Sequence, residues 1–248
     1  MCAFSAPNQK HTSDYTIGPS VQPLVIYGEG WSQQFTIINV EYYQPEPTIG
    51  ILHFYRSDGQ PWRIPLKGYG TTDQVAVNLQ PGKMLVIQTE VSQQPQQLGW
   101  AALELSSNID QWGIYHAFTT FRKQTPGSPD LMTSVPFVDG LEDEWIIPFD
   151  NTEGKFPGIA VVNAYSRTDT FTFDVYDTTD TRRTTFQKTI GPNNLLWFSL
   201  LAEHPELAGV AGQIKIHSQG LESAVFSLQF AGNGAFTALP MVHTFGMR

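Results

Sequence analysis

The chain has 248 residues, of which 12% are aromatic and 15% charged, and its 14 basic and 23 acidic side chains give a formal charge of −9. This acidic balance lacks the excess of Lys and Arg that binds phosphate backbones, so we expect no nucleic-acid partner. No apolar run approaches the roughly 20 residues that cross a bilayer, and we expect no membrane-spanning segment.

The N-terminal stretch is polar and carries the chain's one cysteine, Cys2. A single cysteine cannot form an internal disulfide, so we expect the fold to depend on packing alone. A cysteine followed by a polar linker is also how mature bacterial lipoproteins begin. Two interpretations of Cys2 therefore stay open, a lipid-attachment site or an ordinary thiol near the terminus. We expect residues 1–22 to form a tether or arm.

Residues 23–140 alternate short apolar runs with turn sequences. The run Phe35-Thr36-Ile37-Ile38 is rich in aromatic and β-branched residues, and residues 115–121 place apolar side chains at nearly every second position. A period of two indicates a strand with one buried face. Between the runs lie the clusters Ser57-Asp58-Gly59, Lys67-Gly68-Tyr69-Gly70, Gln80-Pro81-Gly82 and Pro126-Gly127-Ser128-Pro129. Many short strands with turns at this spacing predict an antiparallel β-sandwich.

An acidic, glycine-containing stretch at residues 139–144 marks the domain boundary that we expect, with a second domain at residues 141–248. In that domain Phe171, Phe173 and Val175 alternate with polar residues, and residues 224–230 show a similar pattern. Both segments are predicted strands. The one helical candidate, residues 200–207, is limited to about a turn by its proline.

The second half repeats the order of motifs in the first. Asn39 and Asn163 each end an apolar run and lie 124 positions apart, whereas Pro136 and Pro240 close the two halves and lie 104 apart. The shrinking offset indicates shorter loops in the second copy, and a repeat of this length is a whole domain. The sequence therefore predicts an all-β chain of two tandem antiparallel β-sandwich domains related by internal duplication.

Catalytic constellations are missing from the sequence. There is no Gly-x-Ser-x-Gly elbow, and the histidines form neither a His-x-His nor a His-Glu-x-x-His motif. We therefore expect no enzymatic activity and no cofactor. One weak alternative stays open in the acidic run Glu142-Asp143-Glu144, because the carboxylate pair of a glycoside hydrolase is defined by its distance in the folded chain.

Aromatic residues beside turns are the best candidates for ligand binding. Trp31, Trp62, Trp112 and Tyr69 lie next to turn residues, where exposed rings would stack on the sugar rings of a polysaccharide. The competing interpretation places these rings in the core, because aromatic side chains bury large areas.

Acidic turns supply candidate calcium sites, one at residues 150–153 and a second at Asp177 with Asp180. Asp150, Asn151 and Glu153 offer oxygen ligands of the kind that calcium prefers. Their spacing matches no EF-hand, and the same residue types are ordinary in turns. Calcium binding is therefore a weak prediction, and we expect no other metal.

A series of short motifs resembles a family. In the first half these motifs are Gly30-Trp31, Asn39, Asp58-Gly59, Pro81-Gly82, Gly99-Trp100-Ala101 and Pro136. Their order is similar to that of a tandem immunoglobulin-like β-sandwich repeat in uncharacterised secreted or surface proteins of soil bacteria. The second half departs from the pattern at Asp180-Thr181, where Asp-Gly is usual, and at Gln213, where Trp is usual. The resemblance implies an immunoglobulin-like pair outside the cytoplasm and no catalytic residue.

The leading hypothesis is a non-enzymatic, extracytoplasmic structural or protein-interaction module, with other protein subunits or a second copy of itself as partner. It would serve as a subunit of a surface assembly, anchored by lipid if Cys2 is modified. The alternative is a carbohydrate-binding module that uses the loop aromatics.

Overall fold

The computed structural model describes residues 20–40, 47–105, 115–127, 129–139, 141–218 and 223–243. The prediction of an all-β chain is confirmed, because antiparallel sheets make up nearly all of the regular structure. The one α-helix in these ranges, α1 (Leu200–Glu203), is followed by a 3-10 turn, η1 (Pro205–Leu207). This agrees with the single helical turn expected there.

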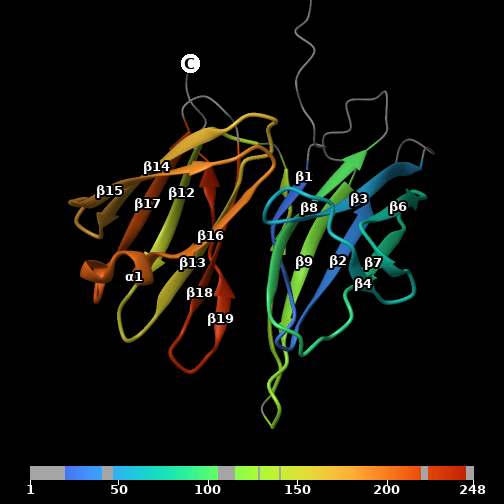
Figure 1. Cartoon of the computed structure of the whole chain (residues 1–248), viewed down its shortest axis with the longest axis horizontal. Helices are drawn as coiled ribbons and strands as arrows, with labels where there is room; N and C mark the ends of the chain where they lie inside the picture. The colour runs from blue at the N-terminus through green and yellow to red at the C-terminus, as the bar shows by residue number, and fades with distance from the viewer. Residues whose placement is uncertain are drawn as a thin grey trace, which may run out of the picture.

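The first half of the chain folds into two facing sheets (right in Figure 1). The five-stranded sheet has the order β11-β1-β8-β3-β6. Its strands are β1 (Ser20–Tyr27), β3 (Thr48–Arg56), β6 (Gln74–Leu79), β8 (Gln97–Leu105) and β11 (Val138–Asp139). The four-stranded sheet, in the order β10-β9-β2-β7, contains β2 (Trp31–Asn39), β7 (Met84–Gln88), β9 (Tyr115–Lys123) and β10 (Leu131–Pro136). A small hairpin joins β4 (Ile64–Leu66) to β5 (Gly70–Thr72).

The second half also forms a five-stranded and a four-stranded sheet (left in Figure 1). The order β15-β14-β17-β12-β20 joins β12 (Glu144–Asp150), β14 (Asp169–Asp177), β15 (Arg182–Ile190), β17 (Ala211–Ser218) and β20 (Val242–His243). The order β16-β13-β18-β19 joins β13 (Phe156–Val162), β16 (Leu195–Ser199), β18 (Ala224–Phe230) and β19 (Phe236–Ala238). No ladder in the described ranges joins a strand of one half to a strand of the other.

The two halves have the same strand order. The orders β6-β3-β8-β1-β11 and β7-β2-β9-β10 of the first half match the orders β15-β14-β17-β12-β20 and β16-β13-β18-β19 of the second half, strand by strand. The β4–β5 hairpin has no counterpart among the described strands of the second half. The order is not that of an immunoglobulin domain, in which the first two strands lie in one sheet. Here β1 and β2 lie in different sheets. The immunoglobulin-like expectation therefore holds only as far as antiparallel sandwiches.

The repeated asparagines have the same structural task. The Asn39 side chain donates from Nδ2 to the carbonyl of Leu79, the last residue of β6, at 2.9 Å. Asn163 donates from Nδ2 to the carbonyl of Ile190, the last residue of β15, at 3.1 Å. Both side chains are buried, and each satisfies a strand-end carbonyl that would otherwise lose its hydrogen bond. This explains why each apolar run ends in Asn.

The first strand overlaps the end of the N-terminal tether that was expected over residues 1–22. β1 begins at Ser20, so residues 20–22, expected in the tether, are a fully buried strand segment instead. The expected division near residue 140 lies between β11 and β12. Apolar and polar residues do not alternate in β1, where the consecutive residues Leu24, Val25 and Ile26 are all buried, so a period of two does not reveal this strand.

The hydrophobic core of the second half extends across the boundary between the halves. The outward faces of β13 and β18 pack against β1 and the neighbouring edge of the first half. Phe121 stacks on Phe226 with ring centroids 5.6 Å apart, and Trp31 lies 4.8 Å from Phe236. Hydrogen bonds reinforce the contact, since the Leu195 amide donates to the Ser57 carbonyl at 2.9 Å. The halves are therefore packed together.

Candidate functional site

The structure buries two of the three described aromatic candidates. Trp31 is 6% exposed and Trp62 is 2% exposed, so neither ring presents a face for stacking on a sugar. Tyr69, in the turn between β4 and β5, is 45% exposed. Trp112 and Cys2 lie outside the described residues. The predicted aromatic platform is thus represented by a single exposed ring.

The acidic turn after β12 already contains a cation. Lys155 Nζ lies 2.8 Å from Asp150 Oδ2 and 3.5 Å from Glu153 Oε2. The Lys155 ion pair and the hydrogen bonds from Thr152 lower the pKa of Asp150 to about 2. Asn151 is buried and donates to the Leu207 carbonyl at 3.3 Å. The turn is thus closed by its own lysine, and calcium binding there stays a prediction.

The described ranges contain neither a metal-binding cluster nor a helix that could cross a membrane. No group of three or more His, Cys, Asp or Glu side chains is placed to hold a metal ion there. Within the same ranges, no helix is long and apolar enough to cross a membrane.

The outward face of the sheet β10-β9-β2-β7 is the most distinctive free surface. Alternation decides which side chains point out, because Phe35, Ile37 and Ala117 point into the core. The residues at the intervening positions define what we call the β2–β9 face: Ser32, Gln34, Thr36, Ile38, Met84, Val86, Gln88, His116, Phe118, Thr120, Arg122, Met132, Ser134 and Pro136.

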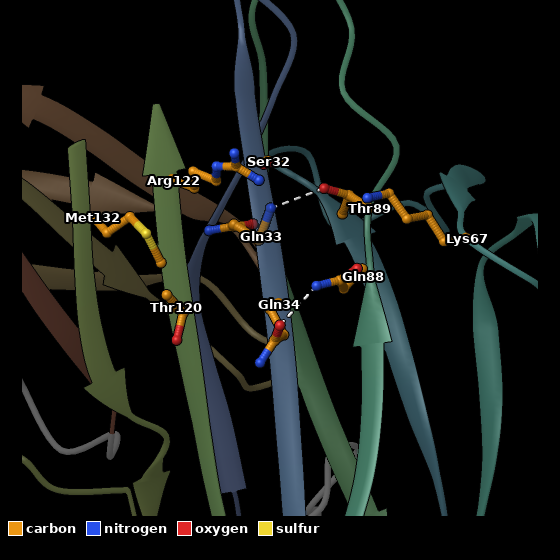
Figure 2. A pocket seen from close by; sticks show the side chains of 9 residues that line it. All are labelled: Ser32, Gln33, Gln34, Lys67, Gln88, Thr89, Thr120, Arg122 and Met132. Carbon is orange, nitrogen blue, oxygen red and sulfur yellow. Dashed lines mark hydrogen bonds between the residues drawn. The ribbon is translucent and has the colours of Figure 1, made fainter. Parts of the chain in front are cut away.

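Uncharged polar groups cross the middle of this face in one row. The register aligns Ser134, Thr120, Gln34 and Gln88 on four adjacent strands. Gln88 donates from Nε2 to Gln34 Oε1 at 2.7 Å (Figure 2). The hydroxyls of Thr120 and Ser134 are 2.8 Å apart. Gln34 in turn donates to the Thr36 hydroxyl at 3.3 Å. The row is therefore ordered by contacts between its own members.

A shallow hollow lies at one end of the face (Figure 2). Lys67 and Arg122 lie on opposite sides of the hollow. Between them the backbone amide of Gln33 donates to the Thr89 hydroxyl at 2.9 Å. Arg122 is tied to the carboxylate of Asp130 through two hydrogen bonds. The hollow offers amides, hydroxyls and one further cation, Lys67, to a ligand.

Exposed apolar side chains are concentrated in the first half. The large hydrophobic residues that are exposed within the described ranges are Ile49, Ile51, Tyr69, Met84, Val86, Val91, Met132 and Val242. Seven of these eight lie in the first half, and three of them belong to the β2–β9 face. Met132 is 61% exposed and Met84 is 59% exposed. Apolar groups at this level of exposure, beside uncharged polar ones, are typical of a contact surface.

The sequence alone did not single out the β2–β9 face, because a period of two in one strand does not show which strands lie side by side. The available signal was the absence of charge. Among the face residues Arg122 alone carries a formal charge at neutral pH, with His116 at the far end, whereas 15% of the whole chain is charged. A count of charges at alternate positions of the four strands would have singled the face out.

Comparison with known proteins adds no identification. A scan against protein-family models, a search of curated proteins and a search of solved structures each found no match to this chain.

Proposed function

We propose that the chain is a non-enzymatic structural or protein-interaction module, built from two sandwiches related by duplication, with the β2–β9 face as its docking surface. One observation carries the proposal. The face that occupies the same position in the second half is buried by protein, against the first half of the chain. A location outside the cytoplasm is part of the proposal and rests on the sequence resemblance alone.

The correspondence between the two faces is residue by residue. Thr36 pairs with Phe118 across β2 and β9, and Ala160 pairs with Phe226 at the same place across β13 and β18. Ala160 and Phe226 are almost fully buried, and Phe226 stacks on Phe121 of the first half. The four-stranded sheet of this fold therefore has an outward face that suits packing against another sandwich. In the second half this face is covered by the first half, whereas in the first half it is the uncovered β2–β9 face.

The chemistry of the free face suits a protein partner. Contact surfaces between proteins combine apolar side chains with hydrogen-bonding groups and are poor in charge at their centre. Val86 and Met132 supply exposed apolar area on the outer strands, and the row through Gln34 and Thr120 supplies donors and acceptors between them.

Site-specific photo-crosslinking tests this assignment. A photoreactive residue at Val86 or Met132 of the full chain, activated in the cells that express it, is expected to give discrete adducts with protein. The matched control is the same residue at Thr172, on the outward face of β14, an inner strand of the five-stranded sheet of the second half. Equal labelling at Thr172, or no adduct at either face position, would refute the assignment.

Carbohydrate binding is the second candidate, favoured by the hollow beside Lys67 and by the exposed ring of Tyr69. Amides, hydroxyls and cations are the groups that bind sugar hydroxyls and acidic sugars, but the face lacks a Trp or Tyr platform. Affinity gels that contain plant or bacterial cell-wall polysaccharides distinguish the two candidates. Retardation that is lost in Tyr69→Ala would support sugar binding, and unchanged mobility in every gel would exclude those polysaccharides.

A further inference from the structure

We infer that the β2–β9 face pairs with the same face of a second copy of this chain, across a two-fold axis. The inference rests on the proposed function, because it names the partner of that docking surface. Three features support it: the packing inside the chain, the distribution of charge, and the hydrogen-bonding groups of the face.

The contact within the chain is already a contact between two sandwiches of the same strand order. It buries the β13–β18 face, which corresponds to the β2–β9 face, and it includes ring stacking at 5.6 Å between Phe121 and Phe226. The β13–β18 face meets the edge of the first half around β1, so a sheet face with this geometry packs against a sandwich of this fold inside the chain. A second copy of the chain would present a sandwich of this same fold to the uncovered β2–β9 face.

Charge restricts which surface can meet a copy of itself. The chain carries a formal charge of −9, so two copies repel unless they meet on a neutral patch. The outward face of β14 and its neighbours carries Asp174, Lys215 and Arg182, and the outward face of β3 and β8 carries His53 paired with Glu104 at 3.3 Å. On the β2–β9 face the one formal charge is neutralised by Asp130.

The polar groups of the face are self-complementary. Across a two-fold axis the face meets an identical copy of itself. Carboxylates would then face carboxylates, and ammonium groups would face ammonium groups, and both arrangements repel. Gln, Thr and Ser side chains each contain a donor and an acceptor and can therefore bond to their own kind. Gln34, Gln88 and Thr120 form the centre of the face, with Met84 and Met132 on the outer strands to bury apolar area.

Sedimentation velocity of the full chain from about 1 to 100 μM tests the inference, and a concentration-dependent dimer is the expected result. Thr120→Lys places like charges on the two opposed faces and is expected to weaken dimerisation about 100-fold, because like charges across an interface cost several kcal/mol. Thr172→Lys is the matched control, since Thr172 is also an outward threonine that accepts a side-chain hydrogen bond, at 3.2 Å from Gln187. Its dimer should be unchanged.

Mixing identifies the symmetry. Thr120→Lys and Thr120→Glu are each expected to be mainly monomeric, whereas their mixture should form a heterodimer, because opposite charges then meet across the axis. Circular dichroism of each variant establishes that it is folded. A monomeric parent chain, a dimer insensitive to Thr120→Lys, or a mixture that stays monomeric would overturn the inference. If the parent is monomeric but its β2–β9 face crosslinks to a different protein, the proposed function survives without this partner.

Discussion

Asp177 closes the turn between β14 and β15 through several hydrogen bonds to one carboxylate. Its Oδ1 accepts from the Thr179 amide at 2.8 Å and from the Thr181 amide at 3.0 Å, and its Oδ2 lies 2.7 Å from Arg183. These donors, with the Thr179 hydroxyl first among them, lower the pKa of Asp177 from 3.8 to about 2. The carboxylate form is thus the one that the turn binds.

The lowered pKa predicts a specific acid sensitivity. A carboxyl group with a depressed folded-state pKa contributes stability above its unfolded pKa, near 4, and loses that contribution as the pH falls through about 2. In Asp177→Asn the free energy of unfolding should therefore change less between pH 4 and pH 2 than in the parent chain. Urea titrations at several pH values measure this. Asp180→Asn is the control, because Asp180 has φ of +59°, a conformation that Asn also adopts, and equal slopes in the two variants would contradict the prediction.

Gly99 and Gly212 occupy the same place in the two halves, and both lack room for a side chain. Gly99 in β8 lies opposite Arg56, and Gly212 in β17 lies opposite Asp177. A Cβ atom at Gly99 would lie 2.1 Å from the Tyr55 carbonyl oxygen, and one at Gly212 would lie 1.9 Å from the corresponding oxygen of Tyr176. Contacts this short with backbone require the strands to move apart.

Alanine at either position is therefore expected to lower the free energy of unfolding by about 1 to 3 kcal/mol, the range typical of overpacked sites. Thermal or urea unfolding measures the change. Gly232→Ala serves as the control, because a Cβ there meets nothing closer than 3.8 Å. If Gly99→Ala or Gly212→Ala is as stable as Gly232→Ala, this account of the two glycines fails.

At the scale of elements, a glutamine side chain replaces a missing strand contact at the edge of the first sandwich. The register of β1 against β8 is interrupted between Gln22 and Val25. Gln33, reaching from β2 in the other sheet, accepts from the Ile26 amide and donates to the Leu24 carbonyl, both at 3.2 Å. In the second half Gln229 makes the same pair of bonds to the backbone of Asp150.

Gln33→Leu should destabilise the chain by roughly 1 to 3 kcal/mol, because it removes both of these buried hydrogen bonds and leaves the Leu24 carbonyl with the Gln22 side chain as its remaining side-chain donor. Gln187→Leu is the control, since Gln187 is an exposed residue of β15 and its loss should cost less than about 0.5 kcal/mol. Chemical denaturation of both variants gives the comparison. Similar stability of the two would show that the edge does not need the amide.

The strands could be predicted from the sequence far better than the surfaces they form. Alternation at Phe171, Phe173 and Val175 correctly placed one face of β14 in a core. In β18 the same pattern predicted one buried face, that of Phe226, but it did not show that the opposite face, with Val225, is buried as well, or that the cover of Phe226 comes from the other half of the chain. The sequence left open whether Trp31 is exposed or in the core, and its ring is covered by Phe236 from the other half of the chain. Period-two patterns report local geometry, and burial by a distant sandwich adds no local signal.

The whole molecule depends on the contact between the halves, and Trp100 is central to it. Trp100 is fully buried, stacks on Tyr55 with centroids 4.4 Å apart, and donates from Nε1 to the Asn193 carbonyl at 3.1 Å. The residue at the same place in the second half is Gln213, opposite Tyr176, on a face that is partly exposed. At this position the first half has Trp100, which the second half covers, and the second half has Gln213, which no other sandwich covers.

Exchanging these two residues tests whether the halves unfold together. Trp100→Gln removes a buried ring and should cost about 3 to 5 kcal/mol, most of it from the contact between halves, so that urea unfolding changes from one transition toward two. Gln213→Trp should change the free energy of unfolding by less than about 0.5 kcal/mol, because no sandwich covers that face. Both effects are measured by tryptophan fluorescence and far-UV circular dichroism on the same samples. Coincident curves for Trp100→Gln, shifted as one transition, would instead mean that each half still requires the other to fold.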